Sequence, residues 1–225
     1  MASLLTHGVA ALGIGACLLE RGTPRRIWIA GMLCAMVPDL DVIGFGMRIR
    51  YGDFWGHRGF THSILFAALL AAAIALVIPP RTRGETPHSD AVQNGERWNI
   101  AQRGLLLWAY LFLATASHGL LDAMTNGGLG VAFFSPFDNT RYFLPWRPLV
   151  VSPIGVSKFF GERGLAVLRT EFLWVWIPTA LLATMVLGLR RRISQVAGEC
   201  YLSGYDGRNQ RIPFAGWAGG SQVMT

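Results

Sequence analysis

An uninterrupted apolar run of 15 residues, Ile64–Ile78, constrains this chain more than any other feature of its sequence. The run contains no polar side chain and stops at Pro79-Pro80, where a helix cannot continue. Phe172–Leu189 is a second long uncharged run, and it stops at an arginine triplet. Such segments are typical of membrane helices, because a helix needs about 20 residues to cross the bilayer core.

Three further segments complete a set of five expected membrane helices. Leu105–Ala116 is apolar, whereas Leu4–Leu19 contains one histidine and Ile27–Met47 contains two aspartates. The composition agrees with this interpretation, because 52% of the residues are hydrophobic and only 15% are charged, against roughly 25% charged residues in ordinary soluble domains. We therefore expect an all-α integral membrane bundle of about five transmembrane helices.

The segments between and after these helices differ in character. Residues 81–103 are polar and predict a linker, and residues 193–225 predict a polar, Gly-rich C-terminal tail that follows a membrane domain of residues 1–192. Residues 129–160 alternate aromatic side chains with Pro and Gly. Aromatic residues are enriched at membrane–water boundaries, so an aromatic interfacial segment is expected after the fourth helix.

The charges and the cysteines narrow the class of protein. The net charge is +7, but the arginines stand in short groups between apolar runs. This pattern favours membrane-flanking charge over a nucleic-acid surface, and no nucleic-acid partner is expected. Three cysteines, two of them inside apolar runs, predict neither a disulfide framework nor a zinc–thiolate cluster.

The distribution of basic residues predicts an orientation in the membrane. Loops 20–26 and 80–104, with everything after residue 189, hold twelve basic residues, whereas loops 46–61 and 123–171 hold eight. By the positive-inside rule the first set is cytoplasmic. The N-terminus and the loops of the second set are then expected on the outer face of a bacterial inner membrane, with the C-terminus in the cytoplasm.

Histidines and aspartates occur where the expected helices would begin or end. Ionisable residues inside apolar runs are costly and point to function. His118 and Asp122 are four residues apart, so on a helix they share one face. An extended turn after Pro38 would direct two aspartates the same way. The whole set is His7, Asp39, Asp41, His57, His62, His118 and Asp122.

The alternation of the helices puts this set at one membrane face, whichever way the protein is oriented. Imidazole and carboxylate are ligands for zinc, and they also suit manganese, so the set predicts a metal site. Structural roles remain open for its members. His7 can be an interfacial or capping residue, the His57–His62 segment a solvated loop, and His118 with Asp122 a buried hydrogen-bonded pair.

The motif order resembles that of a known family. The motifs that carry the resemblance are, in order, HG near the N-terminus, PDLD, HRGFTHS and SHGLLDAMTNGG. With these motifs the sequence resembles the YdjM-like family of bacterial inner-membrane proteins, which are candidate metal-dependent hydrolases. That family is distantly similar to zinc-dependent phospholipase C and single-strand zinc nucleases. The resemblance implies metal ligation by a set of five residues, with Asp39 and His57 next in line: His7, Asp41, His62, His118 and Asp122.

The resemblance also implies a mechanism of metal-assisted hydrolysis. One or two divalent ions, zinc first and manganese as the alternative, are expected, because no later His/Glu pair completes a three-metal cluster. Asp39 would accept the proton of the attacking water. Arg58 would hold a substrate phosphate, with Asn126 and Arg147 as weaker candidates. The site's position suggests membrane lipids or another amphipathic, phosphate-containing ester as substrate.

Two alternatives come from other classes of protein. An ion- or proton-coupled membrane transporter would use the His/Asp cluster as a relay, and it predicts polar residues throughout the bilayer depth. A non-catalytic membrane scaffold would use the cluster only to lock helices together. Metal content and metal-dependent activity separate the three interpretations.

Overall fold

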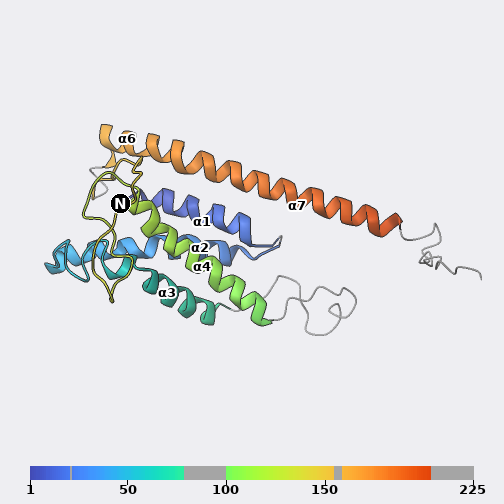
Figure 1. Cartoon of the computed structure of the whole chain (residues 1–225), viewed down its shortest axis with the longest axis horizontal. Coiled ribbons are helices and arrows are strands. Elements are labelled where there is room, and N and C mark those ends of the chain that lie inside the picture. Colours follow the sequence, from blue (N-terminus) through green and yellow to red (C-terminus); the bar gives the residue numbers. More distant parts are fainter. Residues whose placement is uncertain (21, 79–99, 155–158, 204–225) are drawn as a thin grey trace, which may run out of the picture. The chain divides into compact units, whose positions relative to one another are not determined.

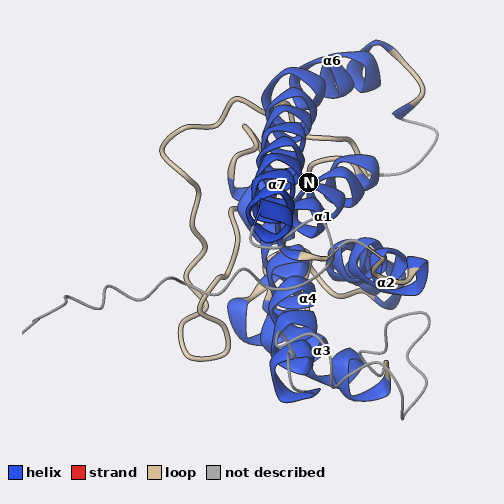
Figure 2. Ribbon diagram, turned by 90° about the vertical axis from the view of Figure 1, so that its right-hand side faces the viewer, coloured by secondary structure: helices blue, strands red, loops and turns tan. Residues whose placement is uncertain are grey.

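The computed structural model describes residues 1–20, 22–78, 100–154 and 159–203, and in these residues the secondary structure is helical without a strand (Figures 1 and 2). The chain divides into two compact units, Met1–Thr184 and Met185–Thr225. The helices, in chain order, are α1 (Leu4–Leu18), α2 (Arg25–Met36), η1 (Val37–Met47), η2 (Phe60–His62), α3 (Ile64–Val77), α4 (Ile100–Ala123), α6 (Glu162–Glu171), η3 (Phe172–Trp176) and α7 (Ile177–Ser203). Of these, η1 and η2 are 3₁₀ helices and η3 is a π-helix.

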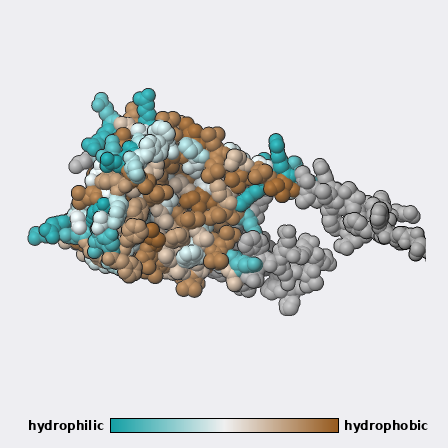
Figure 3. All heavy atoms as spheres, viewed as in Figure 1, coloured by the Kyte–Doolittle hydropathy of each residue, from teal (hydrophilic) through white to brown (hydrophobic). Residues whose placement is uncertain are grey.

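The expected membrane helices all form. Within the described residues, three continuous helical stretches are long and apolar enough to cross a membrane: Arg25–Met47, Ala101–Ala123 and Glu162–Gln195. Leu4–Leu18 and Ile64–Val77 are shorter apolar helices. Hydrophobic side chains also cover much of the surface of the first unit, whereas hydrophilic ones gather at the end where its N-terminus lies (Figures 1 and 3). Lipid-facing helices require this pattern.

Small residues let the helices of the first unit approach one another closely. Ala11 of α1, Ala35 of α2 and Ala114 of α4 form one cluster and are fully buried. A second cluster surrounds Tyr110 of α4, whose ring packs next to Gly31 of α2. Close packing around small residues is a main source of helix association in membranes, because lipid is as apolar as the side chains themselves.

Serine residues cap the starts of two helices, and a proline stands where α2 passes into a 3₁₀ helix. The Ser3 and Ser63 hydroxyls accept hydrogen bonds from backbone N–H groups in the first turns of α1 and α3, which satisfies donors that would otherwise have no partner. Pro38 lacks an N–H, and the chain continues there as the 3₁₀ helix η1. The expectation of an extended turn after Pro38 is therefore wrong.

Two expected boundaries shift. Residues 81–99 of the expected linker lie outside the described residues, and α4 already begins at Ile100, so residues 100–103 are helical. In the expected tail, α7 continues to Ser203, so residues 193–203 are helical, and residues 204–225 lie outside the described residues. The division at residue 192 stays a prediction.

The aromatic segment after α4 is irregular rather than helical up to residue 154. Isolated backbone pairings join Thr125 to Leu149 and Val131 to Tyr142, so the segment folds back on itself. Several of its aromatic side chains are exposed: Phe134, Phe137, Tyr142, Trp146 and Phe160. Its place at the membrane boundary stays a prediction.

We expect the substitution Gly31→Ala to destabilise the bundle. A Cβ at residue 31 would lie 2.1 Å from the Tyr110 hydroxyl oxygen, so the buried ring must move, at a cost of about 1–3 kcal/mol. The measurement is thermal unfolding of the detergent-purified protein. Gly104→Ala is the matched control, because a Cβ there meets nothing within 4 Å. Equal melting temperatures for Gly31→Ala and the wild type would contradict this packing.

Candidate metal centre

Four helices and one loop bring the predicted histidines and aspartates together at one end of the first unit. His7 lies in the first turn of α1, Asp39 and Asp41 lie in η1, His57 lies in the loop before η2, and His62 ends η2. His118 and Asp122 lie near the end of α4. Two groups of these side chains could hold a metal ion. The first is Asp39, His62, His118 and Asp122; the second is Asp41, His57 and His62.

The first group has the spacing of metal ligands. The Nε2 atoms of His62 and His118 are 3.1 Å apart, and His118 Nε2 is 3.3 Å from Asp39 Oδ1. His62 Nε2 is 3.6 Å from Asp122 Oδ2. Ligand atoms bound tetrahedrally to zinc at 2.0–2.1 Å are about 3.3 Å apart. The four side chains therefore surround a position that suits one ion with small adjustments.

The tautomer of His118 directs a lone pair toward this position. Its Nδ1 lies 2.7 Å from the Ala35 carbonyl oxygen. Since a carbonyl oxygen can only accept, Nδ1 carries the proton and Nε2 is left with its lone pair. Metal-binding histidines usually have such a partner on the other ring nitrogen, because it fixes the orientation of the ring.

Several buried polar atoms at this end have no hydrogen bond within the described part of the chain. They are both carboxylate oxygens of Asp39, both ring nitrogens of His7, and Nε2 of His57. Asp39 is 4% exposed, and His7 and His57 at most 1%. Buried polar groups without partners are costly and rare. A cation bound among these atoms would compensate this cost.

His7 lies against the first group. Its ring stacks on that of His118, with the ring centres 3.7 Å apart. Its Nε2 is 3.8 Å from Asp122 Oδ1. His7 is therefore close enough to join the first group after a small movement of its side chain.

Asp41 of the second group is saturated with contacts. Its carboxylate accepts hydrogen bonds from Thr61 Oγ1 at 2.8 Å and the Arg58 backbone N–H at 3.2 Å. It also lies 2.7 Å from His57 Nδ1 and 3.2 Å from His62 Nδ1. Asp41 thus orients both histidine rings, and it leaves His62 Nε2 directed at the first group.

The electrostatics of His62 favour positive charge between the carboxylates. Burial lowers the pKa of His62, but the nearby carboxylates of Asp122, Asp39 and Asp41 outweigh this effect and raise the pKa to about 10. Burial lowers the pKa of His57, although its hydrogen bond with Asp41 acts in the opposite direction. The three aspartates therefore stabilise a cation at the position where the first group converges.

Arg58 is held inside the protein by hydrogen bonds to its neighbours. Its Nε donates to Asp122 Oδ2 at 3.0 Å, Nη1 to the Gly127 carbonyl at 2.9 Å, and Nη2 to Thr125 Oγ1 at 2.9 Å. The side chain is fully buried, and the backbone has a left-handed φ of 63°. The guanidinium thus joins the HRGFTHS loop to the end of α4.

The structure does not bring Asn126 and Arg147 into this cluster. Asn126 is exposed, and its Oδ1 accepts a hydrogen bond from the Val151 backbone N–H at 3.0 Å. Arg147 is also exposed, and its guanidinium lies 4.8 Å from the centre of the Phe143 ring. Their expected role in substrate binding stays a prediction without a contact that supports it.

Glu171 is a buried acid whose role the sequence interpretation missed. It ends α6, is fully buried, and accepts hydrogen bonds from Ser3 Oγ at 2.6 Å and Thr6 Oγ1 at 2.8 Å. Trp176 Nε1 donates to the same Thr6 oxygen at 2.7 Å. This network holds the start of α1, and therefore His7, against α6 and η3. The sequence feature that could have indicated this role is the position of Glu171 directly before an apolar run, where an acid is costly unless it has partners.

The motifs match a known family along most of the chain. Residues 1–193 match the family described as YdjM inner membrane protein. The chain belongs to this family. The match includes every residue of the candidate metal centre, and with the apolar helices it places the protein in the inner membrane.

A curated relative agrees with this assignment. The inner membrane protein YbcI of Escherichia coli (strain K12) is 35% identical over 192 residues, which are 85% of this chain and 100% of the relative. The comparison with solved structures found no significant match. The family resemblance inferred from the motifs is thus confirmed, as is the all-α membrane fold.

We expect Arg58→Gln to destabilise the protein strongly. It removes the guanidinium from a buried ion pair and leaves the charge of Asp122 only partly compensated, which costs about 3–5 kcal/mol. The measurement is unfolding in mixed micelles, followed by tryptophan fluorescence. Arg48→Gln is the control, because Arg48 also has a left-handed φ of 62° but is exposed. Similar unfolding midpoints for the two variants would show that the buried pair contributes little.

Proposed function

We propose that this protein is a membrane-bound, metal-dependent hydrolase that acts on a phosphoester or a lipid-linked ester. One observation carries the proposal: the buried Asp39 carboxylate, which has no hydrogen bond, lies among His62, His118 and Asp122 with the spacing of metal ligands. If the cluster only locked helices together, there would be no reason for Asp39 to lack partners, because a structural polar network is stable only when its members are satisfied.

The donor set fits a divalent cation. Two imidazole nitrogens and two carboxylates, from His62, His118, Asp39 and Asp122, are borderline and hard ligands that suit zinc first and manganese second. His7 is a further ligand within reach of the first group. A bound divalent ion would supply Lewis acidity and a water of lowered pKa.

The residues of the chain divide into ligands and positioning groups. Asp39 is proposed as a ligand through Oδ1, which faces His118, while Oδ2 is available to accept a proton from water. Asp41, expected from the resemblance to be a ligand, is better suited to hold His57 and His62 in place. Arg58 holds Asp122, so we assign it a positioning role instead of contact with substrate.

The substrate class follows from the surroundings of the site. The protein lies in the inner membrane, and the loops beside the cluster expose aromatic side chains such as Trp55 and Phe134. Such side chains favour the lipid headgroup region. The excess of basic residues in the other loops supports an outward-facing site. An amphipathic ester that carries phosphate is therefore the proposed substrate.

We expect the purified protein to bind one or two equivalents of zinc or manganese. In Asp39→Asn and in the double variant His118→Ala, Asp122→Ala, bound metal should fall at least about tenfold, because charged or coordinating atoms are lost from the first group. The measurement is inductively coupled plasma mass spectrometry on protein in detergent. Asp53→Asn is the control, because Asp53 pairs with Arg50 on an exposed loop. Wild-type protein that stays metal-free when zinc and manganese are supplied would favour the relay or scaffold alternatives.

We expect phosphoester hydrolysis that depends on this metal. Bis(p-nitrophenyl) phosphate and phosphatidylglycerol vesicles are suitable first substrates. Activity should disappear with a chelator and return with zinc or manganese, and Asp39→Asn should lower kcat by at least about a hundredfold. Asp53→Asn should retain the activity. Metal-loaded protein that hydrolyses neither substrate class would leave a metal centre without the proposed phosphodiesterase function.

A further inference from the structure

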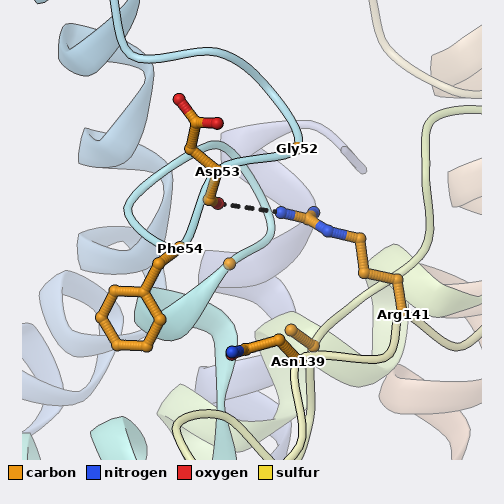
Figure 4. Close-up of a pocket in the computed structure, with 7 residues that line it drawn as sticks. Gly52, Asp53, Phe54, Asn139 and Arg141 are labelled. Carbon is orange, nitrogen blue, oxygen red and sulfur yellow. Dashed lines mark hydrogen bonds between the residues drawn. The ribbon is translucent and has the colours of Figure 1, made fainter.

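A pocket beside the metal centre is lined by an arginine that no carboxylate neutralises. The pocket lies between the loop that follows η1 and the irregular segment after α4, and Arg141 and Asn139 form part of its wall (Figure 4). Gly52, Gly59 and Ala132 also line it. Because these residues have little or no side chain, they form the pocket wall mainly with backbone atoms and keep the pocket open.

The Arg141 guanidinium is held in place by three carbonyl groups and lies over the Tyr51 ring, 5.8 Å from its centre. Nη1 donates to the His57 carbonyl at 2.8 Å, and Nη2 donates to the carbonyls of Tyr51 at 3.0 Å and Asp53 at 3.2 Å. Within the described residues no carboxylate lies within ion-pair distance of Arg141, and its Nε has no hydrogen bond. Its positive charge is thus half-buried and fixed in orientation, and it forms no ion pair within the described residues.

The acid that lines the pocket, Asp53, points away from Arg141. Figure 4 shows the Asp53 carboxylate directed away from Arg141, whereas its backbone carbonyl accepts the hydrogen bond. The carboxylate of Asp53 pairs with Arg50 at 3.2 Å. Asp138 likewise accepts hydrogen bonds from Thr140 and Tyr142. The pocket therefore carries net positive charge.

Asn139 adds a second donor. Its Oδ1 accepts a hydrogen bond from Ser135 Oγ at 2.8 Å, which leaves the amide N–H₂ group for a ligand. Phe54 provides an apolar wall, and it is 36% exposed. The planar guanidinium of Arg141, the amide N–H₂ of Asn139 and the apolar side chain of Phe54 together suit a phosphate group attached to an organic moiety.

We propose that this pocket binds the phosphate of an anionic ester, carried either by a lipid headgroup or by a small free phosphoester. The site is separate from the metal centre and needs no metal ion, so it holds whether or not the protein is a hydrolase. Arg141 also bonds to the carbonyl of His57. An occupant of the pocket therefore touches the same loop that presents the histidines to the metal centre.

The test is binding of two probes to the full-length protein in detergent with a chelator present. The probes are dihexanoyl phosphatidylglycerol and glycerol 3-phosphate, and the Kd is measured by isothermal titration calorimetry. Asn139→Asp keeps the shape and the contact to Ser135 but places a negative charge in the pocket, so affinity should fall at least tenfold. Arg141→Gln should have the same effect. Arg48→Gln removes the same charge from an exposed residue that does not line the pocket, and it should bind as the wild type does.

Each outcome decides the matter. Tenfold weaker binding in Asn139→Asp, with binding to Arg48→Gln unchanged, supports the pocket. Binding of both probes assigns the pocket to phosphoesters in general, and binding of the lipid alone assigns it to a headgroup. Asn139→Asp supports this conclusion even if Arg141→Gln fails to fold. Equal affinity of Asn139→Asp and the wild type would overturn the proposal. So would the absence of binding of either probe in the presence of the chelator, including the case in which a probe binds only when the chelator is left out.

Discussion

The polar end of the bundle depends on the interactions of one buried carboxylate, that of Asp122. One oxygen accepts a hydrogen bond from the Ala2 backbone N–H at 2.7 Å and lies 3.8 Å from His7. The other accepts from Arg58 Nε and lies 3.6 Å from His62. A single buried side chain thus joins the end of α4 to the start of α1 and to the HRGFTHS loop. Because Asp122 is fully buried, its charge must be compensated, and these partners provide the compensation.

The 3₁₀ helix after α2 explains why two nearly adjacent aspartates have different surroundings. Successive residues of a 3₁₀ helix are about 120° apart around the axis, so residues two apart do not share a face. Asp39 accordingly meets His118 and lacks hydrogen bonds, whereas Asp41 contacts His57 and His62 and has all the partners it needs. An ion-binding and a positioning carboxylate can therefore come from one short motif, PDLD.

Two buried networks support the candidate site from opposite sides. Glu171 and Trp176 hold Ser3 and Thr6 at the start of α1, which keeps His7 stacked on His118. Arg58, Thr125 and the Gly127 carbonyl hold the loop that carries His57 and His62. Such supporting contacts fix ligand atoms before an ion arrives, and a preorganised site binds more tightly because less side-chain freedom is lost.

The sequence by itself determined the apolar helices, the inner-membrane family and the set of histidines and aspartates at helix ends. These follow from local features: uncharged runs of helical length, and motifs read along the chain. Tertiary structure alone decided which atoms meet. The separate surroundings of Asp39 and Asp41, the burial of Arg58 against Asp122 and the contact of Glu171 with α1 join residues up to 168 positions apart. Helical periodicity carries no information about such contacts, because they depend on how the helices pack and on where an irregular loop turns.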